Sequence, residues 1–187
     1  MGAPRKQCTI KLVGNRNCTY NKKQWSYNMQ LNLSTTPEII EFAPAFFVYL
    51  EKRGSFPKQA PLAWQEFRAI TLNTVKYATQ DMAGMGHIDS TVQGDDACIY
   101  QAGILLNEKL KDIPAGLQMR ILNAQRYAGF VYIGAYSQLA QVYPKIFMML
   151  GKANFNIRND FSMERYRNTP MDTPEEKLET EILIPVG

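Results

Sequence analysis

The chain has 187 residues, of which 45% are hydrophobic and 11% aromatic, with 21 Lys and Arg against 17 Asp and Glu. This composition excludes an intrinsically disordered polymer, and the length suits one domain with or without an extension. No apolar run approaches the roughly 18 to 20 residues that span a bilayer. The first thirty residues also lack the apolar core of a signal peptide, so we expect a cytoplasmic protein that does not associate with membranes.

The charge is unevenly distributed along the chain. Residues 1–37 hold six basic residues and no acidic residue, whereas residues 38–187 hold 15 basic and 17 acidic residues. We expect 1–37 to be a basic N-terminal extension, either poorly ordered or in contact with phosphates. Apart from a short strand expected over 9–13, it has no pattern for a helix-turn-helix, so we expect no DNA-reading domain in this chain.

The body, residues 38–187, repeats one order of elements in two halves, 38–112 and 113–187. In the first half, apolar patterning predicts a strand, a helix and two further strands, at 39–50, 61–77, 87–92 and 97–106. We expect Gly84 and Gly86 to end the helical region, and Gly94 to begin the turn between the last two strands.

The second half opens with a strand in two pieces and continues with a helix and two strands. These elements are predicted at 117–122, 127–133, 137–150, 161–167 and 179–186. Pro144 lies within the helical pattern, so we expect it to kink this helix or to shift its start. Gly151 is the expected stop.

Two similar breaks mark the same place in each half. Gly54-Ser55-Phe56 and Gly134-Ala135-Tyr136 share the pattern glycine, small residue, aromatic residue, and they lie 80 residues apart. We therefore predict an α+β fold made of duplicated βαββ units. Its antiparallel sheet would carry two main helices, one on each side of a central ligand cleft.

Several motifs in the second half resemble those of GyrI-like domains, the gyrase-inhibitory and multidrug-sensing family of effector-binding domains. The matching segments are Ile113–Gly116, Ala124–Ala128, Gly134-Ala135-Tyr136, the Glu-x-Tyr of Met163–Tyr166 and Thr180–Val186. The family usually has Gly-Pro-Tyr where this chain has Gly134-Ala135-Tyr136. The resemblance extends over 38–187 and is that of a stand-alone member, which implies small-molecule binding without an attached DNA-binding domain.

Glu164 is the leading candidate for a functional residue. It shares a strand face with Ser162 and Tyr166, and the resemblance implies that it lies at the floor of a pocket for cationic, lipophilic ligands. A carboxylate among aromatic rings loses hydration, and a flat, delocalised cation can restore what is lost by pairing and stacking. The alternative is an ordinary solvent-facing glutamate on a strand.

Aromatic residues would form the walls of this cleft. We choose Tyr49, Trp64, Tyr132 and Tyr166 as ligand-binding residues beside Glu164, because Tyr and Trp combine an apolar ring with one polar atom. The wider set of candidates also contains Phe47, Phe67, Tyr100, Tyr136, Tyr143 and Phe147.

Two other functions stay open. Some stand-alone relatives resemble hydrolases that open strained cyclopropane rings in genotoxic compounds, and here Glu164 and Tyr136 would supply acid and base. The chain could instead modulate gyrase or act with a separately encoded DNA-binding protein. His87 is the only histidine and has no partner at metal-binding spacing, so we predict no metal and no cofactor.

Overall fold

The protein is described by a computed structural model that covers residues 31–72 and 81–187. The strand expected at 9–13 and the basic residues of the N-terminal extension lie outside the described residues. In the unit that starts at Leu31, the side chains of Leu31 and Leu33 pack against the apolar core.

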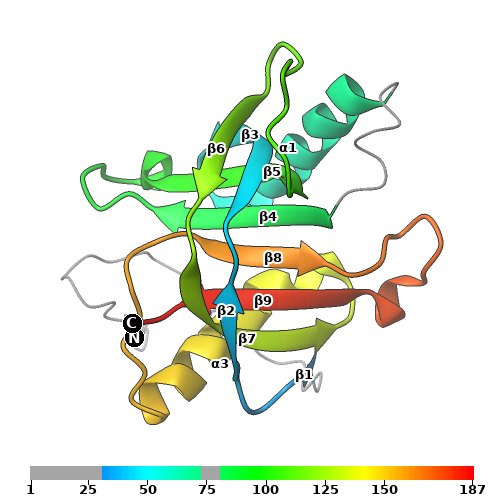
Figure 1. The fold of residues 1–187 in the computed structure, drawn as a ribbon. Coiled ribbons are helices and arrows are strands. Elements are labelled where there is room, and N and C mark those ends of the chain that lie inside the picture. The colour runs from blue at the N-terminus through cyan, green and yellow to red at the C-terminus, as the bar shows by residue number, and fades with distance from the viewer. Residues whose placement is uncertain (1–30, 73–80) are drawn as a thin grey trace, which may run out of the picture. The chain divides into compact units, whose positions relative to one another are not determined.

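Nine strands of the described residues form one antiparallel sheet in the order β1-β7-β9-β8-β4-β5-β3-β6, with β2 also paired to β7 (Figure 1). Their bounds are β1 Asn32–Leu33, β2 Glu38–Phe42, β3 Ala45–Arg53, β4 Asp81–Ile88, β5 Cys98–Leu106, β6 Gln118–Leu122, β7 Gln125–Ile133, β8 Ser162–Tyr166 and β9 Glu179–Pro185. The two long helices are α1 Phe56–Thr71 and α3 Leu139–Lys152. The α+β class predicted from the sequence is therefore correct.

The two halves match with an offset of 80 residues. Adding 80 to the residue numbers of strands β2 and β3 gives the bounds of β6 and β7, so the corresponding strands have the same lengths. The pairing registers show the same offset, since Phe47 lies opposite Leu105 in β3–β5 and Tyr127 lies opposite Pro185 in β7–β9. The origin of the halves by duplication stays a prediction.

The sheet bends back on itself because the two halves exchange their first strands. Strand β2 pairs with β7 and β6 pairs with β3 in one continuous register, from Glu38 opposite Gly129 to Tyr49 opposite Gln118. The single strand predicted over 39–50 is therefore wrong in one respect: it is divided between Phe42 and Ala45. Pro44 lies in this break, where its missing N–H cannot continue the ladder.

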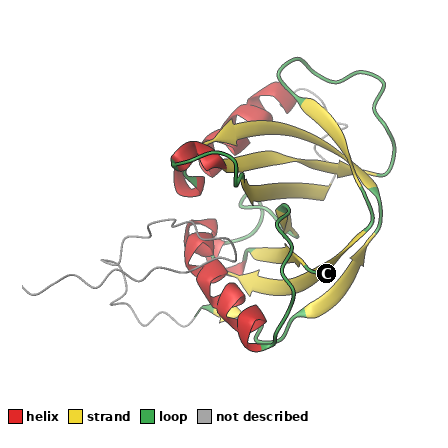
Figure 2. Cartoon of the chain, turned by 90° about the vertical axis from the view of Figure 1, so that its left-hand side faces the viewer, coloured by secondary structure: helices red, strands yellow, loops and turns green. Residues whose placement is uncertain are grey.

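Both helices cover the same face of the sheet (Figure 2). Helix α1 packs on β3 and β5 around Leu50, Phe67 and Ile104, and α3 packs on β7 and β9 around Ile146 and Ile182. A third apolar cluster fills the opposite face, where the sheet curves around it. Its buried members are Phe47, Tyr49, Ala83, Met85, Leu105, Leu122, Tyr127, Met163 and Leu183.

The helix boundaries differ from the predicted ones. Helix α1 begins at Phe56 rather than at Pro61, because Pro57 lies in the first turn, where a missing N–H costs no helical bond. The predicted end near residue 77 lies outside the described residues. Helix α3 continues through Pro144 to Lys152, one residue beyond the expected stop, and a short 3-10 helix, Tyr136–Gln138, precedes it.

The position of strand β4 differs most from the prediction. Gly84 and Gly86 were expected to end a helical region and the strand was expected at 87–92, but the strand covers 81–88. Neighbours on both sides, β5 and β8, supply its backbone hydrogen bonds. This tertiary pairing outweighs the low intrinsic preference of glycine for strands.

Candidate functional site

Glu164 lies in the middle of β8, and only 8% of its surface is exposed. Strand β4 places Gly84 opposite it on one side, and β9 places Ile182 opposite it on the other. Ile182 belongs to the cluster beneath α3, so the glutamate side chain projects onto the helix-covered face of the sheet. A carboxyl group is therefore held within the apolar layer between sheet and helices.

Three tyrosine hydroxyls surround this carboxyl group. Tyr143 of α3 donates to Oε1 at 2.8 Å. Tyr166, two residues along β8, donates to Oε2 at 2.6 Å, and Tyr100 of β5 donates to the same oxygen at 3.4 Å. The donors come from both halves, so the carboxylate cage defined by these four residues exists only in the folded sheet.

Trp64 of α1 fixes the direction of these hydrogen bonds. Its indole N–H donates to the Tyr100 hydroxyl oxygen at 3.1 Å. Because an indole nitrogen can only donate, the single proton of Tyr100 points inward, toward Glu164 or toward the Tyr166 hydroxyl 3.1 Å away. The network therefore presents donors to the carboxylate and suits its ionised form.

Because Gly84 has no side chain, the hydroxyls of Tyr100 and Tyr166 can lie next to its Cα atom. A Cβ atom at this position would come within 2.2 Å of the Tyr100 hydroxyl oxygen and 2.9 Å of the Tyr166 hydroxyl oxygen. Real side chains do not tolerate such contacts, so any other residue here would displace at least one tyrosine. The absence of a side chain at Gly84 is thus part of the construction of the cage.

Burial and hydrogen bonding act in opposite directions on Glu164. Burial raises the pKa of its carboxyl group, while the hydroxyls of Tyr166, Tyr143 and Tyr100 favour the charged form and lower it. Burial and the neighbouring carboxylate raise the pKa of Tyr143 and of Tyr166 well above the usual value. The phenols accordingly keep their protons and serve as donors.

No basic side chain in the described part of the chain forms an ion pair with Glu164. The half-buried rings of Trp64 and Tyr136 lie against Tyr166 in edge contacts, with centroid distances of 5.4 and 5.0 Å. Burial raises the pKa of Tyr136 to about 12, and its hydroxyl donates to the Asn168 carbonyl oxygen at 3.1 Å. The arrangement is a buried carboxyl group without a basic partner in 31–72 and 81–187, bordered by partly exposed aromatic rings.

The structure separates the predicted site residues into two groups. Glu164, Tyr166 and Trp64 lie together, and Tyr136 adjoins them. Tyr132 is fully buried beneath α3, and its hydroxyl donates to Gln138 at 2.6 Å. Tyr49 belongs to the cluster on the opposite face, where its ring stacks on Phe47 at 5.2 Å.

Tyr100 and Tyr143 were among the aromatic candidates but were not chosen, although both contact Glu164. Tyr100 alternates with Ala102 and Ile104 on the helix-covered face of β5, which is a signal visible in the sequence. What the sequence does not contain is the order β5-β4-β8, which brings that face beside Glu164.

The described residues contain neither a cluster of metal ligands nor a membrane-spanning helix. Within 31–72 and 81–187, no three His, Cys, Asp or Glu side chains gather as metal ligands. His87 stacks on Phe161 instead, at 4.8 Å between ring centroids. None of the helices described combines the length and the apolar character that a membrane span requires.

Solved structures with the same fold come from several bacterial proteins. SAV2435 bound to tetraphenylphosphonium is 18% identical, with a TM-score of 0.61 over 81% of this chain and 93% of that chain. A hydrolase from Listeria innocua is 13% identical, with a TM-score of 0.56 over 82% and 92% of the two chains. A putative transcription regulation protein from Staphylococcus aureus MU50 is 19% identical, with a TM-score of 0.55 over 80% and 97%.

The family assignment rests on the sequence of almost the whole described unit. No curated protein matches the chain at a significant level. The family model of the GyrI-like small molecule binding domain, in contrast, matches residues 35–187. The chain therefore belongs to the GyrI-like family of small molecule binding domains.

Proposed function

We propose that this domain binds a small amphipathic cation with aromatic groups, and that Glu164 supplies the opposite charge. The observation that carries the proposal is a buried carboxylate that accepts three tyrosine hydroxyls and has no ion-pair partner among the described residues. A buried charge without a counter-charge is costly, so a ligand cation gains more here than at an exposed glutamate.

The surrounding rings favour a delocalised cation over an ammonium group. Trp64, Tyr136 and Tyr166 present ring faces and edges next to the carboxylate cage. A cation against an aromatic ring gains about 0.5–2 kcal/mol, depending on its desolvation. A large organic cation loses little hydration on entering such a site, whereas a small ammonium ion loses much.

One relative in fold agrees with this class of ligand. SAV2435 was solved bound to tetraphenylphosphonium, a cation that carries four phenyl rings. At 18% identity this likeness concerns the fold, so it supports the chemical class and not a particular ligand for our chain.

Calorimetric titration with tetraphenylphosphonium tests the proposal. Glu164→Gln keeps the size of the side chain and removes its charge, and we expect it to weaken binding by about tenfold or more, or at least 1.4 kcal/mol. Glu175→Gln is the matched control, because Glu175 is exposed and the same charge is lost. Equal affinities of wild type and Glu164→Gln would exclude the electrostatic role of Glu164.

Hydrolysis of a strained cyclopropane ring is the second candidate, because a carboxylate and several phenols meet at one place. Water would bond through its oxygen to a ring carbon as a ring C–C bond breaks. A conjugated carbonyl would take up the electron pair and a tyrosine proton, and Glu164 would accept the proton of water. The raised pKa values of Tyr143 and Tyr166 make them weak acids, which favours binding over this reaction.

Mass spectrometry separates the two functions. After incubation of a cyclopropane-containing compound with the protein, hydrolysis adds the mass of one water, whereas binding alone returns the compound unchanged. We expect the unchanged compound. A water adduct that forms with wild type but not with Glu164→Gln would establish the enzyme instead.

A further inference from the structure

Arg120 of β6 is a charged residue on the sheet face opposite Glu164. It pairs across the sheet with Phe47, so its side chain lies against the third apolar cluster. The guanidinium carbon lies 4.2 Å from the ring centroid of Phe161 and 5.5 Å from that of Tyr49. Its terminal nitrogen approaches the sulfur of Met85 at 3.3 Å, which is a weak acceptor.

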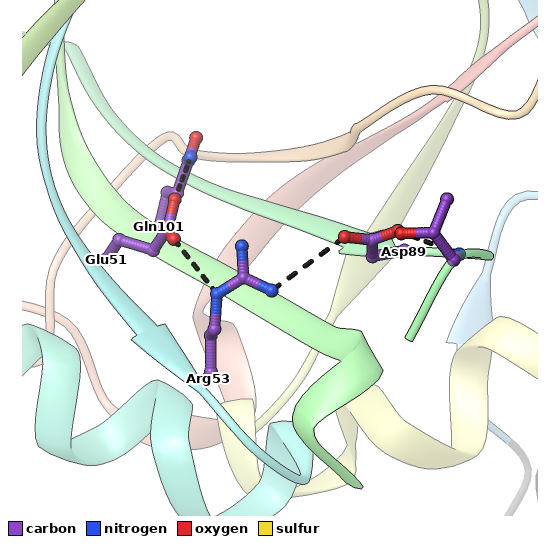
Figure 3. Close-up of polar contacts among 5 residues, drawn as sticks. Glu51, Arg53, Asp89 and Gln101 are labelled. Atoms are coloured by element: carbon purple, nitrogen blue, oxygen red, sulfur yellow. Dashed lines mark hydrogen bonds and ion pairs between the residues drawn. The ribbon is translucent and has the colours of Figure 1, made fainter. Parts of the chain in front are cut away.

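The acidic residues nearest to Arg120 are engaged elsewhere. Glu51 accepts from the Gln101 side-chain nitrogen at 2.8 Å and pairs with Arg53 at 3.5 Å (Figure 3). Arg53 in turn reaches Asp89 at 3.9 Å in the same network.

Asp160, the other nearby acid, pairs with Arg158 at 3.2 Å and accepts from the Phe161 backbone at 2.7 Å. No carboxylate forms an ion pair with Arg120 in the part of the chain that the structure describes.

The fold does not need a charge at this position. The equivalent residue in the first half, 80 residues earlier, is Ile40. It lies opposite Tyr127 in the sheet, just as Arg120 lies opposite Phe47. Ile40 packs against the same apolar cluster. An aliphatic side chain therefore fills the equivalent place, and the guanidinium of Arg120 is an addition to the fold.

Two buried polar atoms in this region lack a hydrogen-bond partner within 31–72 and 81–187: Nε of Arg120 and Oε1 of Gln101. Gln101 is 2% exposed and lies next to Met85 in the sheet register, on the same face as Arg120. The Nε–H group of Arg120 is therefore a donor without an acceptor among these residues. Arg120 and Phe161 are half-buried, so solvent reaches the region.

We propose that Arg120 and the rings of Tyr49 and Phe161 form a second binding site, for a small aromatic carboxylate. The carboxylate accepts N–H bonds from the guanidinium, whose planar fork matches its two oxygens. The aromatic ring of the ligand lies against the edges of Tyr49 and Phe161, which already enclose the guanidinium. This site lies on the opposite face of the sheet from the carboxylate cage and has the opposite charge.

Benzoate is the probe for this site, with benzyl alcohol as the uncharged counterpart. We expect saturable benzoate binding to wild type in calorimetry or NMR titration, and at least about tenfold weaker binding to Arg120→Ile, which copies Ile40. Arg126→Ile removes one positive charge from an exposed pair with Glu41 and is expected to bind benzoate like wild type. Glu164→Gln is expected to leave benzoate binding unchanged, and benzyl alcohol is expected not to compete.

A stability measurement on Arg120→Ile and a second variant, Arg120→Lys, separate a loss of binding from a loss of folding. Arg120→Ile is expected to fold and to melt at or above the wild-type temperature, because it removes an unpaired, partly buried charge. Arg120→Lys keeps the charge but lacks the planar fork, so benzoate binding should weaken several-fold even if the isoleucine variant does not fold. Absence of saturable benzoate binding to wild type, or equal affinity of wild type and Arg120→Lys, would overturn the proposal.

Discussion

Glu164 and Arg120 are both charged residues set among aromatic rings, on opposite faces of one sheet. Around Glu164, three hydroxyls donate to the carboxylate. Around Arg120, ring faces and one sulfur take the place of acceptors, and Nε has no partner among the described residues. The first charge is stabilised by fixed hydroxyl dipoles, whereas the second lies against rings and a sulfur, with Asp160 and Glu51 acting on it without forming an ion pair.

The offset between the halves sharpens this contrast. The residue equivalent to Glu164 in the first half is Gly84, and the residue equivalent to Arg120 is Ile40. Each charge thus occurs in one half only, while the strands around it occur in both. The equivalent strand positions in the other half carry no charge, which agrees with the two binding sites that we propose.

The largest effect is expected from Gly84→Ala. A methyl group would lie 2.2 Å from the Tyr100 hydroxyl and force it away from Glu164. Because overpacking and the loss of a hydrogen bond to Glu164 both apply, we expect a cost of about 3 kcal/mol or more in unfolding free energy. Tetraphenylphosphonium binding should fall by about tenfold. Urea denaturation and calorimetry measure the two effects.

Gly86→Ala is the control on the same strand, because the nearest atom to its Cβ would be a Phe56 ring carbon at an ordinary 3.5 Å. If Gly84→Ala and Gly86→Ala lost similar amounts of stability and affinity, the cage would not depend on the close approach at Gly84.

Tyr143→Phe should have the next largest effect, because it removes the donor to Oε1 of Glu164. Loss of a hydrogen bond to a charged group costs about 1.5–3 kcal/mol. The substitution also removes a hydrogen bond that lowers the pKa of Glu164, so this pKa should rise further. The pH midpoint of tetraphenylphosphonium binding, which depends on the charged carboxylate, should therefore move upward. Tyr136→Phe, whose hydroxyl donates to Asn168 instead, should leave the midpoint in place.

The pH dependence of stability tests the burial of Glu164 directly. Since burial raises its pKa in the folded state above the ordinary value of 4.5, the folded protein binds a proton more tightly than the unfolded chain. The stability of wild type relative to Glu164→Gln should therefore be greatest below about pH 4.5 and should fall as the pH rises through the raised pKa. Urea melts of both proteins across this range measure the difference, and a difference that does not change with pH would contradict the assignment.

The smallest effect is expected where charges are exposed. Glu41 and Arg126 form an ion pair at 2.9 Å, with 73% and 51% of their side chains exposed. Glu41→Gln should change the unfolding free energy by no more than about 0.5 kcal/mol, because solvent screens such pairs. A loss as large as that of Gly84→Ala would mean that burial does not distinguish the charges of this protein.

Local signals in the sequence predicted most of the fold. The apolar runs of strands β5, β7 and β9 and the apolar stripe of α3 were visible because each is a short-range pattern. Strand β4 was misplaced, since its two glycines have low strand preference and only pairing with β5 and β8 makes it a strand. The division of the first strand at Pro44 likewise depends on the exchange between halves.

The sequence by itself determined the α+β class, the family and the placement of Glu164 on a strand, because a Glu-x-Tyr strand and a closing Ile-Pro-Val strand are contiguous motifs. Only the tertiary structure decided which aromatic residues surround Glu164, and that Arg120 faces the opposite side without a carboxylate partner among the described residues. The reason is geometric. Tyr100 and Tyr143 are 64 and 21 residues away from Glu164 along the chain, and strand order and register, which no local pattern encodes, bring them together.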